Sequence, residues 1–374
     1  MTDRTATRIA TADGQAVTVT SRSAAVTDWA TRYFGSWWNA APAESPISGA
    51  LVSADIDPDA YEDMTASVFG HGSELDKTDY AGSPMLHTRH GDGGVVAVQS
   101  EERLAYRWEP SFRRMRIAGE DETGVATAAA RLAREVVRGM LLVEGWQILH
   151  ASAVTRPDGA TLLVLGDKGA GKTTTAFLLA RAGWRLLAND RVFVRPEDGH
   201  VRVLPWPSAA ACGFGLLDAL GLFEPVAERL RSGEQMHPTQ DQRVTDALLA
   251  GRREPLWKAN GKETKPQFFP DQLRTWLGMT LATKGRAAGL LFPRIVPGGG
   301  PRLVDEPRGP GEADFLTSGT EDRYPDVFGL LPVTGGSAGL VARLSALPHQ
   351  ALALGHDTSA NAALLEKTAA GLID

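Results

Sequence analysis

The segment GDKGAGKT, residues 166–173, is the feature that most constrains the fold of this 374-residue chain. It matches the phosphate-binding pattern G-x-x-x-x-G-K-[S/T] in full. The preceding stretch, ATLLVL, is typical of a buried strand, and the following stretch, TTTAFLLARAG, is typical of a helix that ends at Gly183. Glycines let backbone N–H groups turn toward a phosphate, and a helix N-terminus adds positive potential. This strand–loop–helix unit predicts an α/β core that binds a nucleotide.

Residue types within the loop suggest individual contacts with ATP. Lys172 would reach the β- and γ-phosphates, and Thr173 would offer its hydroxyl to Mg²⁺. The other residues predicted to bind ATP are Gly166, Asp167, Lys168, Gly169, Ala170, Gly171 and Thr174.

A polar pair, Asn189 and Asp190, follows the loop closely. The predicted helix over residues 172–182 carries the chain about 16 Å from the phosphates at ~1.5 Å per residue. The strand candidate WRLLA returns it by about 16 Å at ~3.3 Å per residue. We therefore expect the pair beside the phosphates, where an acidic group can bind Mg²⁺ or accept a proton from an attacking hydroxyl. A simple turn is the alternative, because Asn and Asp favour turns.

A histidine lies just upstream, in ILHASAVTRPDGATLLVLG. Two apolar runs flank the turn signal RPDG, which predicts a β-hairpin in which Thr155 faces Thr161. In that register His150 lies opposite Gly166, the first residue of the phosphate loop. His150 could then hydrogen-bond a phosphate or assist proton transfer, and a structural histidine is the alternative.

The ordered set LHASAV, GDKGAGKT and AGWRLLANDRV resembles the HPr serine kinase family and its HPr-kinase-like relatives, whose core is related to that of phosphoenolpyruvate carboxykinases. The similarity covers about residues 148–195. It implies a P-loop core of the HPr kinase-like type, ATP and Mg²⁺ as cofactors, and phosphate transfer to a hydroxyl. Shorter relatives of this type include kinases that tailor ribosomally made peptides and kinases of free serine.

By this resemblance His150 occupies the active-site histidine position, and Asn189 and Asp190 occupy an acidic pair. The family usually has two aspartates there, so Asn189 is a departure: an amide can orient a nucleophile or phosphate but cannot act as a general base. The candidate bases are Asp190, His150 and, less favoured because it fits the loop's own pattern, Asp167. We expect catalytic roles for Asp190, His150, Asn189 and Lys172, and Mg²⁺ ligation by Thr173 and Asp190.

The phosphate acceptor stays open: a small molecule, a peptide or a protein with a serine-like hydroxyl. The signature loop of full-length HPr kinases for their protein substrate is not found downstream, which disfavours HPr itself. A regulatory or scaffold protein that binds ATP without phosphotransfer is the alternative that Asn189 favours. A carboxykinase-like decarboxylation lacks support, since no second-metal Lys/His pair stands in an assignable context. HPr kinases form oligomers, so a homo-oligomer is an expectation from the resemblance alone.

Upstream of the core, the sequence predicts a smaller mixed α+β domain. A short helix is expected over residues 26–38, an antiparallel meander over 94–119 and a long helix over 123–145. We place a boundary near residue 125, with an N-terminal domain (1–125) for substrate recognition and a kinase core (126–374).

Three further segments of the core carry weaker signals. Residues 252–265 are rich in Lys and Arg and are a candidate mobile lid, with a solvated charged loop as the alternative. The runs AAGLLFPRIVP and GLVARLSALP predict later strands, and residues 305–314 predict a polar surface loop.

Composition excludes several classes of partner. At 43% apolar and 22% charged residues the chain is typical of a globular protein, and its net charge of −6 argues against nucleic acid as the main partner. We find no signal-peptide pattern and no apolar run of membrane-spanning length, so we expect no membrane partner and a cytoplasmic location. The single cysteine cannot form an internal disulfide.

Overall fold

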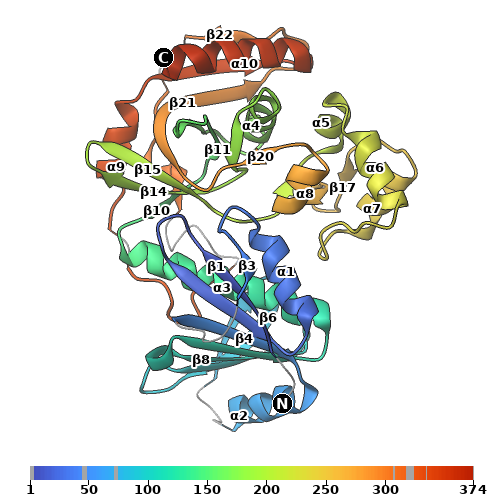
Figure 1. Cartoon of the computed structure of the whole chain (residues 1–374), viewed down its shortest axis with the longest axis vertical. Helices are drawn as coiled ribbons and strands as arrows, with labels where there is room; N and C mark the ends of the chain where they lie inside the picture. Colours follow the sequence, from blue (N-terminus) through green and yellow to red (C-terminus); the bar gives the residue numbers. More distant parts are fainter. Residues whose placement is uncertain are drawn as a thin grey trace. The chain divides into compact units, whose positions relative to one another are not determined.

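The computed structural model describes residues 4–43, 49–70, 75–305, 308–316, 324–333 and 335–373. The chain divides into two compact units, which are Met1–Gln147 with Leu316–Gly335, and Ile148–Phe315 with Gly336–Asp374. Each unit combines a large mixed sheet with helices (Figure 1). The α/β class predicted from the sequence is therefore confirmed. No helix within these described ranges is long and apolar enough to cross a membrane.

The first unit is built on a nine-stranded sheet in the order β3-β1-β2-β4-β9-β8-β7-β6-β5. Neighbours pair antiparallel except at the centre, where β4 runs parallel to both β2 and β9. Strands β7, β8 and β9 form the antiparallel meander predicted for residues 94–119. The strands are β1 (Thr5–Ala10), β2 (Ala16–Ser21), β3 (Ala41–Pro42), β4 (Ala50–Ile56), β5 (Asp76–Tyr80), β6 (Ser83–Arg89), β7 (Val95–Gln99), β8 (Leu104–Glu109) and β9 (Arg114–Gly119).

Helices cover both faces of this sheet: α1 (Ala24–Phe34) and α3 (Glu122–Val143) lie on one face, and α2 (Pro58–Phe69) lies on the other (Figure 1). A short 3₁₀ turn, η1 (Pro110–Phe112), joins β8 to β9. The helices predicted near 26–38 and 123–145 are thus confirmed as α1 and α3. Because α3 packs against β2, β4 and β9, the first compact unit continues to Gln147 and does not end at the boundary placed near residue 125.

The second unit is built on an eleven-stranded sheet whose main path runs β20-β13-β11-β12-β21-β15-β14-β10-β23, with β24 beside β21 and β22 beside β24. Two small sheets, β16-β19 and β17-β18, lie outside it. The main-sheet strands are β10 (Gln147–Leu149), β11 (Ser152–Thr155), β12 (Ala160–Val164), β13 (Arg185–Ala188), β14 (Val192–Glu197), β15 (His200–Pro205), β20 (Thr280–Leu281), β21 (Gly285–Ile295), β22 (Arg302–Val304), β23 (Phe315–Leu316) and β24 (His349–Leu354). The small strands are β16 (Ala210–Ala211), β17 (Leu256–Trp257), β18 (Glu263–Thr264) and β19 (Gln267–Phe268).

The helices of this unit include α4, which follows the phosphate loop and packs against α10. They are α4 (Lys172–Arg181), α5 (Phe214–Ala219), α6 (Phe223–Arg231), α7 (Gln242–Leu249), α8 (Pro270–Thr275), α9 (Ala338–Ser345), α10 (Thr358–Ile373) and the 3₁₀ turn η2 (Glu312–Asp314). The run AAGLLFPRIVP lies in β21 for most of its length, as predicted. The strand predicted for GLVARLSALP is wrong, since residues 338–345 form α9. Leu340 and Leu344, four residues apart, share the buried face of that helix, and a short apolar run fits either structure.

Candidate active site

Three strands bring the candidate residues to one edge of the second sheet. Both β12 and β13 pair antiparallel with β11, which lies between them, so β12 and β13 run parallel to each other. Their carboxyl ends therefore meet at the edge where β11 begins. The phosphate loop follows β12, Asn189 and Asp190 follow β13, and His150 precedes β11. The predicted path, out along α4 and back along β13, is confirmed.

The hairpin that carries His150 has the predicted register. Thr155 pairs with Thr161, and their hydroxyl oxygens lie 3.0 Å apart. The ladder ends where Ser152 pairs with Val164, so His150 lies just beyond the last pair of strand residues. There its backbone N–H donates a hydrogen bond of 2.8 Å to the carbonyl of Asp314, which fixes the approach to β11.

The loop between β12 and α4 depends on glycine. Gly166, Gly169 and Gly171 have φ angles of 149°, 87° and 103°, in the region that favours glycine. A Cβ on Gly171 would also lie 2.9 Å from Ile295 Cδ1. Lys172, the first residue of α4, is buried, and its Nζ donates to the carbonyl of Gly166 over 2.6 Å. The Lys172 side chain thus lies back over the loop, held by the carbonyl of its first residue.

His150 and Asp190 form a pair at this edge. His150 Nε2 donates to Asp190 Oδ1 over 3.1 Å, and the two side chains are 42% and 48% exposed, so a ligand can reach both. Arg191 Nε lies 3.5 Å from the other carboxylate oxygen. Partial burial raises the pKa of Asp190, but the hydrogen bond and charge of His150, with Arg191 and Lys172, outweigh it and hold the pKa below its usual value. Asp190 is therefore a carboxylate at neutral pH.

The electrostatic surroundings of Lys172 add two residues to the site. Burial lowers the pKa of Lys172, and Asp190, Asp167 and Asp314 act in the opposite direction. Arg308 lowers that pKa further, and its guanidinium lies above the ring of Phe292. Asp314 and Arg308 thus bring a negative and a positive charge to the loop from a distant part of the sequence.

Asp314 and Arg308 were missed in the sequence, where residues 305–314 predict only a polar surface loop. Residues 306–307 of that segment lie outside the described residues. Asp314 ends the 3₁₀ turn η2, where its side chain accepts from the Gly311 N–H over 2.8 Å and its carbonyl holds His150. No local pattern signals this contact, because it joins residues far apart in the chain.

Asn189 is nine-tenths buried beside the pair. Its backbone carbonyl accepts a hydrogen bond from Ser152 Oγ, which ties the end of β13 to the start of β11. Its side-chain oxygen Oδ1 is buried, and no donor among the described residues reaches it. A buried amide oxygen without a partner costs about 1–3 kcal/mol, which makes this atom a candidate ligand for a cation or a donor.

The oxygen atoms present fit Mg²⁺ held together with phosphates. Thr173 is partly exposed at the start of α4, and Asp190 and Asn189 end the neighbouring strand. In proteins Mg²⁺ commonly takes one or two carboxylates and completes its shell with water and substrate phosphates. Within the described residues no group of three or more His, Cys, Asp or Glu side chains is placed to hold a metal ion. The donor set therefore suits a shared Mg²⁺ rather than an all-protein metal site.

Comparisons with known proteins find a partial match. No family model matches the chain. HPr kinase/phosphorylase of Levilactobacillus brevis is 36% identical over 76 residues, and those of Lactiplantibacillus plantarum and Lacticaseibacillus casei are 37% identical over 76 residues. Each match covers 19% of this chain and only 24% of the relative's own length. The similarity to HPr kinase-like proteins expected from the sequence is confirmed to that extent.

Solved structures also match the chain. The HPr(Ser) kinase/phosphatase from Coxiella burnetii matches 41% of this chain and 67% of its own, at 11% identity and a TM-score of 0.20.

Proposed function

We propose that this protein is an ATP- and Mg²⁺-dependent kinase that transfers the γ-phosphate to a hydroxyl of a small molecule, peptide or protein. The observation that carries the proposal is the position of the His150–Asp190 pair, at the sheet edge from which the phosphate loop leaves. Phosphoryl transfer requires a phosphate cradle and a group that takes the acceptor proton. The partial similarity to HPr kinase/phosphorylases supports the same chemistry.

In this proposal the loop N–H groups and Lys172 bind the β- and γ-phosphates. Asp190 accepts the proton of the acceptor hydroxyl, whose oxygen forms a bond to the γ-phosphorus. The bond from the γ-phosphorus to the bridging oxygen breaks, and its electron pair leaves with ADP. His150 orients Asp190 through their 3.1 Å hydrogen bond and is the alternative base. Mg²⁺, when bound by Thr173, Asp190 and Asn189 Oδ1, neutralises charge on the phosphates.

The acceptor is the least constrained part of the proposal. We assign its recognition to the N-terminal part of the chain, as proposed from the sequence. The positively charged segment 252–265 contains the hairpin β17-β18, and Arg253 is paired there with Asp218 and Glu224. We keep the lid as a proposal: its closure would have to break these ion pairs or move α5 and α6 with it.

Transfer of label from γ-labelled ATP tests the proposal. The assay contains Mg²⁺ and a panel of acceptors: free serine, threonine, sugars and peptides with a terminal serine. We expect label on one acceptor class and none with Asp190→Asn, because the amide cannot accept the proton. Transfer that survives in Asp190→Asn would remove Asp190 from the base role, and transfer that survives in Lys172→Ala would contradict the proposal as a whole.

A second candidate function is an ATP-binding regulatory or scaffold protein that transfers no phosphate. Asn189 favours it, since the amide stands where two carboxylates are usual in the resembling family. Saturable ATP binding by calorimetry, without label on any acceptor or release of inorganic phosphate, would favour this function over the kinase.

A further inference from the structure

A cavity of about 750 Å³ lies in the first unit, on the side of the sheet that α2 covers. Three aspartates and five arginines line it, so the lining carries a formal surplus of two positive charges. The arginines are Arg4, Arg22, Arg107, Arg114 and Arg116. All lining residues belong to the same unit, and none takes part in the kinase site proposed above.

Strand alternation places these side chains. Along β4, Leu51, Ser53 and Asp55 are partly exposed while the residues between them are buried. Ser53 of β4 pairs with Arg116 of β9, and Arg116 pairs in turn with Arg107 of β8. Arg107 and Arg116 therefore stand directly opposite each other on the cavity face, in adjacent strands.

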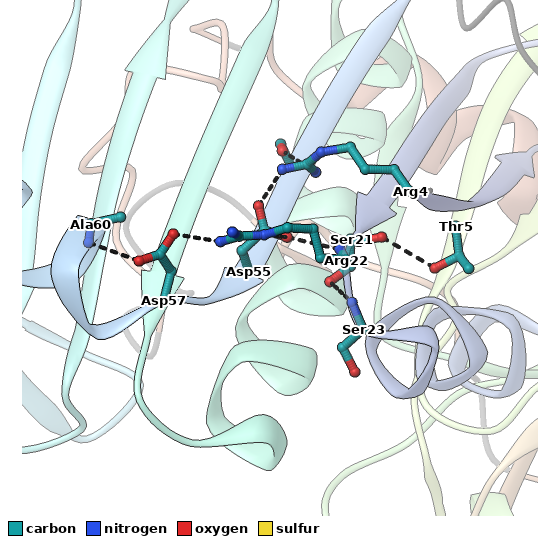
Figure 2. Close-up of polar contacts among 9 residues, drawn as sticks. Arg4, Thr5, Ser21, Arg22, Ser23, Asp55, Asp57 and Ala60 are labelled. Atoms are coloured by element: carbon teal, nitrogen blue, oxygen red, sulfur yellow. Dashed lines mark hydrogen bonds and ion pairs between the residues drawn. The ribbon is translucent and has the colours of Figure 1, made fainter. Parts of the chain in front are cut away.

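Two of the aspartates are already engaged, as Figure 2 shows. Asp57 caps α2 by accepting from the Ala60 N–H over 3.0 Å, and it also pairs with the guanidinium of Arg22. Asp55 accepts from the Arg22 backbone N–H over 2.9 Å and pairs with Arg4. These carboxylates pair with Arg4 and Arg22, and no ion pair within the described residues joins them to Arg107 or Arg116.

Arg107 and Arg116 lack equivalent compensation. Like charges opposite each other on adjacent strands are destabilising. Arg107 Nε is buried, and no acceptor among the described residues reaches it. The ion pair of Arg116 with Glu109 is long, at 3.8 Å. An anion between the two guanidinium groups would supply the acceptor that Arg107 Nε lacks and would offset the repulsion, although water reaches Arg116, whose side chain is 53% exposed.

We propose that this cavity binds a small organic anion, with carboxylate or phosphate groups on an aliphatic frame. Guanidinium groups recognise both kinds of anion with paired hydrogen bonds. Leu51 and Met64 in the lining offer apolar contact for the frame. The volume lies within the range of about 300–1,000 Å³ that small-molecule sites occupy. The proposal does not depend on phosphotransfer by the second unit.

Calorimetric titration of the full-length protein tests this binding, with citrate as the carboxylate probe and glycerol 3-phosphate as the phosphate probe. We expect saturable binding of at least one probe, weakened at high salt. Arg107→Gln and, separately, Arg116→Gln should each reduce its affinity about tenfold or more, because a charge-assisted contact is lost. Arg8→Gln on β1 is the matched control, an exposed arginine of the same sheet outside the cavity lining. Lys172→Ala separates binding here from binding of the phosphate probe at the loop.

Thermal unfolding supplies a second measurement on the same variants. Without an anion, Arg107→Gln should unfold at the same temperature as the unsubstituted chain or higher, because the repulsion is gone. With citrate or glycerol 3-phosphate, proteins that keep both arginines should be stabilised more than Arg107→Gln or Arg116→Gln. Binding of unchanged affinity in both cavity variants, binding abolished by Lys172→Ala, or no saturable binding of either probe at low salt would overturn the proposal.

Discussion

The two anion-binding regions proposed for this molecule are built in opposite ways. In the site proposed for the second unit, backbone N–H groups of one short loop would bind the phosphates together with the buried Lys172. In the first unit, guanidinium groups from β8 and β9, and from the residues just before β1 and just after β2, line a cavity. A site made from backbone requires glycines at fixed positions, so it leaves a pattern in the sequence. A site made from side chains requires only that arginines share a face of a sheet, and it leaves no pattern.

The regions also differ in how their charges are balanced. Lys172 is surrounded by the carboxylates of Asp167, Asp190 and Asp314. Arg107 and Arg116 face each other instead. Removal of the charge of Lys172 should therefore leave the free energy of unfolding nearly unchanged or reduce it. Removal of the charge of Arg107 or Arg116 should leave the free energy of unfolding unchanged or increase it. Four substitutions change the charge in one region or the other, beginning with the one of largest effect.

Lys172→Ala should have the largest effect, a loss of about 10²–10³-fold or more in phosphate transfer, by analogy with removal of a preorganised donor to a developing charge. Circular dichroism should show the fold intact, because Ala is a strong helix former at the first position of α4. Lys284→Ala, an exposed lysine of the same unit, is the control and should transfer phosphate normally. Full activity in Lys172→Ala would mean that the loop does not serve catalysis.

Asn189→Asp should have the second largest effect, on stability and Mg²⁺ binding together. The new carboxylate is buried next to Asp190, so without Mg²⁺ we expect a loss of about 1–3 kcal/mol in the free energy of unfolding. Added Mg²⁺ should then stabilise this variant more than the unsubstituted chain. Thermal unfolding in EDTA and in Mg²⁺ measures both. Asn260→Asp, on the exposed turn between β17 and β18, is the control, and Mg²⁺ should stabilise it no more than the unsubstituted chain. If Mg²⁺ stabilises both variants equally, Asn189 is not part of the metal site.

Much of the phosphate-loop region could be predicted because its determinants are local. The strand, loop, helix and returning strand follow one another within about 30 residues, and their lengths fix where the chain returns. The turn signal RPDG set the hairpin register, so Thr155 and Thr161 pair as predicted. His150 and Asp190 then meet because two short elements end at the same edge of the sheet.

The remainder depends on contacts between distant residues, which a single sequence does not display. Asp314 reaches His150 from more than 150 positions away, through a 3₁₀ turn with no motif. The run containing Leu340 could form a strand or a helix, and burial of its i, i+4 face in the core decided for a helix. Arg107 and Arg116 stand together only because β8 and β9 pair in one register, and a shift of one residue would move either arginine to the other face.

His150→Gln should have a smaller effect, and it separates the two candidate bases. The hydrogen bond and charge of His150 lower the pKa of Asp190, so the substitution should raise that pKa toward its ordinary value near ~4. If Asp190 is the base, transfer falls about tenfold at neutral pH and more steeply under acidic conditions, because more of the carboxylate is then protonated. The measurement is kcat/KM against pH. A loss as large as that of Lys172→Ala, without a shift of the acidic limb, would assign the base to His150.

Asp57→Ala should have the smallest effect, and it tests the charge balance of the cavity by removing a negative charge instead of a positive one. The Ala60 N–H and then the Arg22 guanidinium lower the pKa of Asp57. Because the folded-state pKa lies below the unfolded value, its stabilising contribution is present above about pH 4 and is lost as the pH falls through the folded value. Removal of this helix cap should cost about 1 kcal/mol in the free energy of unfolding at neutral pH, and the difference should vanish in acid.

The same substitution removes one of the two carboxylates beside the Arg22 guanidinium, leaving Asp55 Oδ1 at 3.5 Å, and so makes the cavity more positive. Citrate affinity should therefore rise a few-fold, whereas Arg107→Gln lowers it, and ATP binding at the loop should not change. Asp63→Asn, which removes an exposed lining carboxylate that caps no helix, is the matched control: it should raise citrate affinity slightly and leave stability unaltered. A loss of citrate affinity in Asp57→Ala would mean that Arg22 must be held in place for the cavity to bind, so that the arrangement of the guanidinium groups matters more than their total charge.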